Sequence, residues 1–68
     1  MIFNTTRAFS IRPGDKMPAP LSWGGWDRSQ ALRVTQVGHD RSIGYCIFNL
    51  ENGETVRALS MSMVPFIR

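Results

Sequence analysis

Residues 42–61 read SIGYCIFNLENGETVRALSM, and this stretch decides the fold. Its two flanks are rich in β-branched and aromatic residues, and Asn52-Gly53 lies between them. Both residues of this pair accept the positive φ of a type I′ turn, so the pair is the strongest short signal for a two-residue hairpin. We therefore predict antiparallel strands over 42–50 and 54–61.

Further strands are predicted on both sides of this hairpin. Residues 31–38 (ALRVTQVG) form a strand that pairs with the first of the two through a tight polar turn. A short C-terminal strand follows at 64–68, and Pro65 places it at a sheet edge because proline has no N–H to donate. An additional strand around 9–17 completes the set.

Four or five short antiparallel strands predict an all-β fold, either a small barrel or a strongly bent antiparallel sheet. This architecture resembles the SH3-like small barrel. We expect one domain over 1–68, with 1–10 as a loose N-terminal arm. Residues 18–30 are rich in proline and glycine and are expected to form a long loop. Two helical alternatives remain, a short turn near 27–31 and a helix over 55–64.

Composition limits the chemistry that the chain can perform. One cysteine and one histidine among 68 residues cannot supply the four ligands of a structural zinc site, so we expect no metal and no cofactor. The first ten residues contain no sustained apolar run, and no segment is long enough to span a bilayer. We expect a soluble cytoplasmic protein without a membrane partner.

Charge points to an anionic partner. The chain has eight Lys and Arg against five Asp and Glu, a net charge of +3, and all but one of the basic residues are arginine. The planar guanidinium of arginine binds phosphate and carboxylate groups in a bidentate manner. Nucleic acid and an acidic protein surface are therefore the expected classes of partner.

The predicted turns define a candidate binding row. A two-residue turn at Asn52-Gly53 pairs Phe48 with Arg57, and a turn at Asp40-Arg41 pairs Arg33 with Phe48. An aromatic ring between two guanidinium groups is suited to stacking bases and holding the backbone of single-stranded nucleic acid. The alternative is that Phe48 belongs to a second small core under the N-terminal arm. The face opposite this row is the predicted core face, made of Leu32, Val34, Ile43, Tyr45, Ile47, Val56 and Ala58.

Both tryptophans lie in the predicted loop. Tryptophan is enriched among the residues that dominate binding energy, so Trp23 and Trp26 are candidate partner contacts. A chain this small is expected to bury one ring and expose the other. We expect Trp23 to be the exposed one, because it follows two prolines in an extended stretch. Arg12 and Arg41 are expected to add phosphate contacts.

These observations favour a non-enzymatic small binding domain, with nucleic acid as the ligand. No residues are assigned a catalytic role, since His39 and Asp40 are neighbours in a hairpin tip and do not aim at a common target. The alternative is a protein–protein interaction module that associates with itself or acts as an inhibitor or accessory factor. Its size and arginine bias are compatible with a phage- or plasmid-encoded protein.

Overall fold

A computed structural model describes residues 1–68, and its regular secondary structure is β-strand apart from one 3-10 helix. This confirms the all-β fold class. The elements in chain order are β1 (Asn4–Arg7), the 3-10 helix η1 (Ala8–Ser10), β2 (Lys16–Pro20), β3 (Trp26–Asp40), β4 (Tyr45–Leu50), β5 (Thr55–Leu59) and β6 (Met63–Phe66). No helix in the structure has the length and apolar character that crossing a membrane requires.

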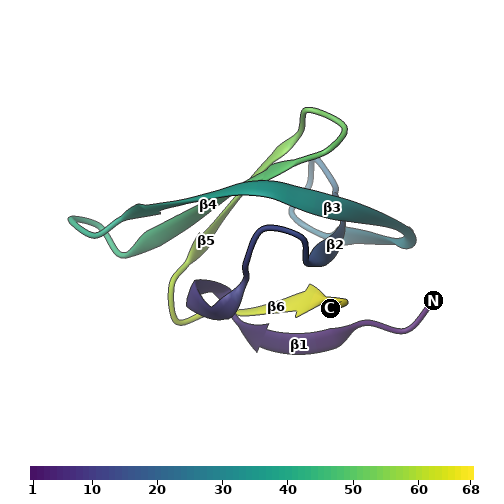
Figure 1. Ribbon diagram of the computed structural model, residues 1–68, viewed down its shortest axis with the longest axis horizontal. Helices are drawn as coiled ribbons and strands as arrows, with labels where there is room; N and C mark the ends of the chain where they lie inside the picture. The colour runs from purple at the N-terminus through teal and green to yellow at the C-terminus, as the bar shows by residue number, and fades with distance from the viewer.

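The strands form two antiparallel sheets, and the larger one, of four strands, curls into a half-barrel. One sheet has the order β2-β3-β4-β5 and curls, and β1 pairs with β6 in the other. The β1–β6 pair lies beneath one face of the curled sheet (Figure 1). The two sheets are joined where the amides of Lys16 and Ile67 each donate to the other's carbonyl, at 2.7 and 2.8 Å. On the other side, the Ala8 amide donates to the Ser62 carbonyl at 2.8 Å.

The hairpin at Asn52-Gly53 is present, but its turn is longer than predicted. The Gly53 amide donates to the Leu50 carbonyl at 3.0 Å, and the Leu50 amide donates to the Glu54 carbonyl at 2.9 Å. Gly53 has a φ of 89°, whereas no residue other than glycine has a positive φ. This pattern describes a type I turn followed by a glycine bulge, with three loop residues rather than the two of a type I′ turn.

The longer turn shifts the β4–β5 register by one residue. Phe48 pairs with Val56, and Ile47 pairs with Arg57. A one-residue shift exchanges the two faces of a strand, because successive side chains point to opposite sides. The predicted register, in which Phe48 pairs with Arg57, is therefore wrong.

The core lies between the curled sheet and the β1–β6 pair. Phe48 and Cys46 on β4 are completely buried, as is Val34 on β3. The predicted core face is wrong at Tyr45 and Ile47, which are only half-buried, and at Ile43, which is exposed; Leu32 and Ala58 are half-buried at its margin. The other members of the buried apolar cluster are Ala8, Ile11, Met17, Leu50, Val56, Val64 and Phe66.

The turn between β3 and β4 also differs from the prediction. Asp40 pairs with Tyr45, so the connection contains residues 41–44 rather than Asp40-Arg41 alone. Val37, not Arg33, therefore lies opposite Phe48 on the neighbouring strand.

Residues 18–30 do not form a long loop, because β2 and the start of β3 are paired there around a short turn at 21–25.

The prediction of a helical turn near 27–31 is also wrong. Asp27 Oδ1 accepts hydrogen bonds from the Ser29 amide at 3.1 Å and the Ser29 hydroxyl at 2.5 Å, while Gln30 donates to Oδ2 at 2.9 Å. These bonds, with the Ser29 hydroxyl first, lower the pKa of Asp27. Asp27 thus caps a local turn in a bulged strand, with the same chemistry that caps a helix.

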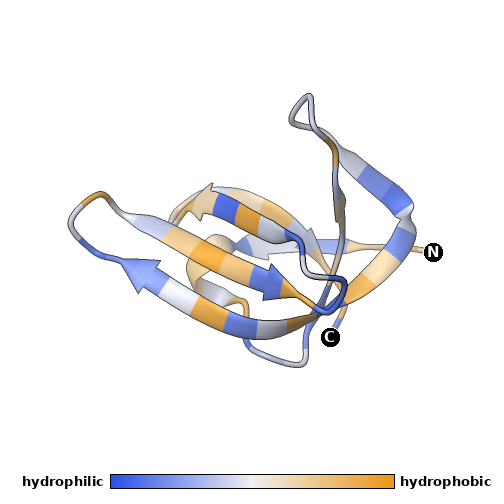
Figure 2. Ribbon diagram, turned by 90° about the horizontal axis from the view of Figure 1, so that it is seen from above, coloured by the Kyte–Doolittle hydropathy of each residue, from blue (hydrophilic) through white to orange (hydrophobic).

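The bulge bends β3 and turns the β2–β3 hairpin away from the body of the protein. Met17 pairs with Leu32 and Ala19 pairs with Asp27, so four residues of β3 lie opposite Pro18 alone. Pro18 cannot donate to the ladder, which explains why β2 is an edge strand and why the register breaks there. Figure 2 shows this hairpin standing apart from the remaining strands.

The ends of the chain are more ordered than expected. Residues 4–7 pair with β6 rather than forming a loose arm. The predicted C-terminal strand is confirmed as β6, which contains Pro65. The prediction of a strand around 9–17 is wrong, since this region contains part of η1, a turn and the start of β2. Residues 55–64 contain β5, a turn and the start of β6, so the helical alternative is wrong there too.

Candidate functional site

The predicted row of Arg33, Phe48 and Arg57 is not formed. Phe48 has no exposed surface, because the longer hairpin turn directs its ring into the core. Arg33 is exposed on β3 and lies opposite Lys16 of β2. Arg57 is exposed on the face of β5 that points away from the core. No surface of this structure brings the three side chains together.

The sheet nevertheless carries an aromatic ring beside an arginine, on the face opposite the core. The Arg57 Cζ lies 5.1 Å from the centroid of the half-buried Tyr45 ring. Leu59 lies opposite Tyr45 on the neighbouring strand and is 50% exposed. We call the side chains of Ile43, Tyr45, Ile47, Arg57 and Leu59 the outer patch.

Asp40 ends β3 next to the outer patch. The Ser42 hydroxyl donates to Asp40 Oδ1 at 2.6 Å and is the main cause that lowers the pKa of this carboxyl. The positive charge of Arg57 contributes in the same direction. The outer patch therefore combines apolar side chains with one cation and a neighbouring anion, which is not the pattern of a surface that attracts phosphate strongly.

Basic side chains gather instead where β2 begins. Lys16 and Arg33 are directly opposite each other on β2 and β3, so their side chains share one face. Arg68 follows β6, which is joined to β2 by the hydrogen bonds between Lys16 and Ile67. Arg12 lies in the turn before β2 and faces the same pocket as Arg68. We call Arg12, Lys16, Arg33 and Arg68 the basic end.

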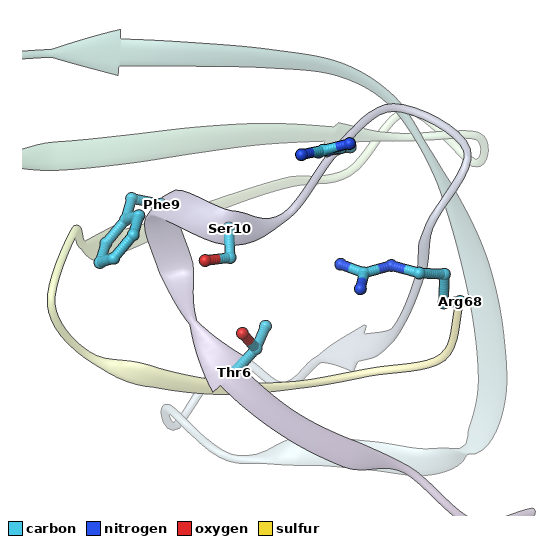
Figure 3. A pocket seen from close by; sticks show the side chains of 5 residues that line it. Thr6, Phe9, Ser10 and Arg68 are labelled. Atoms are coloured by element: carbon cyan, nitrogen blue, oxygen red, sulfur yellow. The ribbon is translucent and has the colours of Figure 1, made fainter.

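A pocket of about 550 Å³ opens at the basic end. It is lined by Thr6 of β1, Phe9 and Ser10 of η1, Arg12 and Arg68. Figure 3 shows the guanidinium of Arg68 reaching across the pocket toward Ser10 and Thr6. The pocket thus presents two guanidinium groups, two hydroxyls and an aromatic ring, all of which are groups that bind phosphorylated or aromatic ligands.

Asp15 holds the two arginines of this pocket in place. Its carboxylate is buried and accepts a hydrogen bond from the Arg12 backbone N–H at 3.0 Å. The Arg68 Nε donates to Asp15 Oδ1 at 3.3 Å, and the Arg68 Cζ lies 4.9 Å from the centroid of the Phe66 ring. Arg68 is therefore oriented from two sides.

Sequence reasoning identified only Arg12 among the five residues of the pocket. Thr6, Phe9 and Ser10 belong to the predicted loose arm, and Arg68 is the last residue of the chain. Alternation of apolar residues indicates where strands lie, but it does not indicate which loops and chain ends come together in the fold. The only available signal was the Arg12-Pro13-Gly14-Asp15 turn, which places an acidic side chain beside an arginine.

The tryptophans divide as expected. Trp23 is 78% exposed at the tip of the β2–β3 hairpin, and Trp26 is half-buried and packs against the core. The Trp23 ring lies over Gly25, where a Cβ would come within 2.5 Å of the Trp23 Cζ3 atom. Arg41 is exposed in the β3–β4 loop just after β3 ends, whereas Arg33 lies in the middle of β3.

The remaining chemically active side chains include one small group, in which Cys46 contacts His39 and Ser60. Cys46 is buried, and its Sγ lies 3.5 Å from His39 Nδ1 and 3.6 Å from the Ser60 hydroxyl. No group of three or more His, Cys, Asp or Glu side chains lies close enough together to hold a metal ion.

Comparisons with known proteins found no relative of this chain. No protein-family model matches the chain, and neither a curated protein nor a solved structure is significantly similar to it.

Proposed function

We propose that this protein is a non-enzymatic binding domain that binds single-stranded nucleic acid through its basic end. The observation that carries the proposal is that two pairs of cations lie at the start of β2: Lys16 and Arg33 face each other across the strands, and Arg12 and Arg68 line the neighbouring pocket. Asp15 is buried and paired with Arg68 in the only ion pair of the protein. The exposed Glu51 lies beside Arg33, whose carbonyl accepts from the Glu51 N–H at 2.9 Å, so four cations at this end stand against two acids. The excess positive charge at this end therefore faces solvent.

A half-exposed aromatic residue, Phe9, borders the same pocket as Arg12 and Arg68. Phe9 is 50% exposed, and its backbone N–H donates to the Ser60 carbonyl at 3.1 Å, which anchors its position in η1. Stacking of one base on such a ring contributes about 1–3 kcal/mol and tolerates any base sequence. The proposed interface combines phosphate contacts with stacking, and we expect affinity without strong sequence preference.

Binding of a fluorescein-labelled oligothymidine, followed by fluorescence anisotropy, tests this proposal. Three phosphate contacts on a single strand, one of them made by Arg12 and Arg68 together, give a slope of about −2.1 in log affinity against log salt, or roughly 20-fold weaker binding at 200 than at 50 mM salt. Arg33→Gln is expected to weaken binding severalfold and to reduce the slope by about 0.7.

Arg41→Gln is the matched control, because it removes the same charge from an exposed site in the β3–β4 loop, outside the basic end. We expect it to leave most of the affinity in place. An affinity that does not change with salt, or equal losses in the two variants, would contradict binding at the basic end.

The outer patch supports a second candidate function, which is association with a second copy or another protein. Leu59 is 50% exposed opposite the half-buried Tyr45, Ile47 follows on the same face of β4, and Ile43, in the loop before β4, is 51% exposed. Exposed apolar patches mark interaction sites in soluble proteins.

Light scattering over a range of protein concentrations tests the second candidate. Leu59→Lys is expected to shift a dimer toward monomer, because it places a charge in the centre of the buried surface, while added salt should have little effect on the wild type. Met61→Lys is a suitable control, since Met61 is 63% exposed in the turn after β5 and lies outside the outer patch. A wild-type protein that remains monomeric at millimolar concentration would exclude self-association.

A further inference from the structure

We propose that the pocket at the basic end is a nucleotide site, in which Arg12 and Arg68 bind the phosphate and Phe9 stacks on the base. This inference rests on the proposed function, because it assigns one nucleotide of the ligand to one pocket. It goes further by predicting that a single mononucleotide, without a polynucleotide chain, binds there. The pocket volume of about 550 Å³ is within the range of about 300–1,000 Å³ that is typical of small-ligand sites.

The side chain of Arg68 is already oriented by its neighbours before an anion binds. Its Nε and Nη2 face the Asp15 carboxylate at 3.3 and 3.5 Å, and its guanidinium lies over the Phe66 ring. A guanidinium has five N–H donors, so the contacts with Asp15 leave donors directed elsewhere. A side chain that is already oriented loses less conformational entropy when the ligand binds, which favours affinity.

Arg12 supplies the charge that Asp15 does not neutralise. The Asp15 carboxylate contacts the backbone N–H of Arg12 and the side chain of Arg68, and no acidic group pairs with the Arg12 guanidinium. Among the side chains, two guanidinium groups stand against one carboxylate, so the side chains at the pocket carry an excess of positive charge. A phosphate that accepts hydrogen bonds from both arginines would balance this charge, and such charge-assisted bonds are the strong ones in proteins.

The other lining groups fit the rest of a nucleotide. The hydroxyls of Thr6 and Ser10 lie on the side of the pocket that the Arg68 guanidinium faces (Figure 3), where they can donate to phosphate oxygens. Phe9 borders the same pocket with half of its surface exposed, and its ring lies on the far side of η1 from the Arg68 guanidinium (Figure 3), so a base would have to extend past η1 to stack on it. Cations, hydroxyl donors and a ring in one pocket are complementary to phosphate and base together.

Titration of the protein with adenosine 5′-monophosphate, followed by amide chemical shifts, tests the inference. We expect saturable binding, with the largest shifts in residues 6–12 and 68. Adenosine should bind at least tenfold more weakly because it lacks the phosphate, and inorganic phosphate should compete at higher concentration. Arg12→Gln should weaken binding of the mononucleotide roughly tenfold, the loss expected for one charge-assisted hydrogen bond.

Three further measurements show whether the mononucleotide binds in this pocket. Arg41→Gln should leave the affinity for the mononucleotide unchanged, and thermal unfolding should show that Arg12→Gln remains folded. Phe9→Ala should weaken adenosine 5′-monophosphate but not inorganic phosphate. Equal affinities for the mononucleotide in wild type and Arg12→Gln would overturn the assignment. If oligothymidine binds while the mononucleotide does not, the nucleotide site is wrong and the proposed function stands; the reverse result retains the site and removes the proposed function.

Discussion

Replacement of Phe48 by alanine is expected to destabilise the folded state by about 3–5 kcal/mol, the cost of removing a buried aromatic side chain. Phe48 is completely buried between β4 and the β1–β6 pair. A domain of this size rarely has more than about 3–5 kcal/mol of net stability, so the variant should be largely unfolded at 25 °C. Guanidinium unfolding, followed by the fluorescence of the tryptophans, measures the difference.

Ile47→Ala is the matched control, because Ile47 is the next residue of β4 and lies on the opposite face. It is half-buried, and we expect a loss of about 1 kcal/mol. Phe48→Leu should fall between these values and keeps the comparison measurable if Phe48→Ala is fully unfolded. A larger loss for Ile47→Ala than for Phe48→Leu would mean that β4 presents its other face to the core.

Phe48 and Ile47 show how much of the fold could be predicted from the sequence. The sequence located the reversal at Asn52-Gly53, but this pair satisfies two turn geometries. A type I′ turn needs positive φ at both residues, whereas the observed turn needs it only at Gly53. The two geometries differ by one loop residue, and this difference decides whether Phe48 or Ile47 is buried.

A second signal in the same strand could have decided between them. The alternate residues Cys46, Phe48 and Leu50 are all apolar, whereas the intervening set of Tyr45, Ile47 and Asn49 ends in an amide. In the structure, the Asn49 amide donates to Gln36 Oε1 at 3.2 Å on the outer face. When turn chemistry is ambiguous, the more apolar alternation should fix the register, because it determines the area removed from water.

The basic end could not be predicted because it depends on contacts between distant segments. Arg68 and Asp15 are 53 residues apart, and they meet only because β6 is joined to the start of β2. Lys16 lies opposite Arg33 because the bulge at Pro18 shifts the register between β2 and β3. Sequence periodicity describes each strand by itself and contains no information on either the bulge or the pairing of β6 with β2.

The curled sheet separates two surfaces with different chemistry. The outer patch exposes apolar side chains on β4 and β5, whereas the basic end collects charge from β2, β3, the turn before β2 and the last residue of the chain. Salt affects the two surfaces differently, because screening weakens charge–charge contacts but leaves apolar contacts in place. One protein preparation measured at two salt concentrations therefore distinguishes the two proposed roles.

Asp15→Ala is expected to destabilise the folded state by about 2–3 kcal/mol and to weaken binding at the pocket. The buried carboxylate of Asp15 contacts the Arg12 backbone N–H and the Arg68 side chain, and hydrogen bonds to charged groups each contribute about 1.5–3 kcal/mol. We discount the ion pair because Arg68 is 62% exposed and screened by water. Chemical unfolding measures the stability, and titration with adenosine 5′-monophosphate measures the site.

Two companion variants separate the roles of Asp15 in folding and in orienting Arg68. Arg68→Gln removes only the exposed ion pair, so we expect a loss of stability of about 0.5–1 kcal/mol together with weaker mononucleotide binding. Asp15→Asn keeps an oxygen that can accept from the Arg12 N–H but removes the charge that orients Arg68, so its stability should lie between those of the other two. If Asp15→Ala is as stable as Arg68→Gln, the bond to Arg12 contributes nothing. The turn before β2 would then be held by its backbone contacts alone, chiefly the Val34 N–H donating to the Asp15 carbonyl at 2.8 Å.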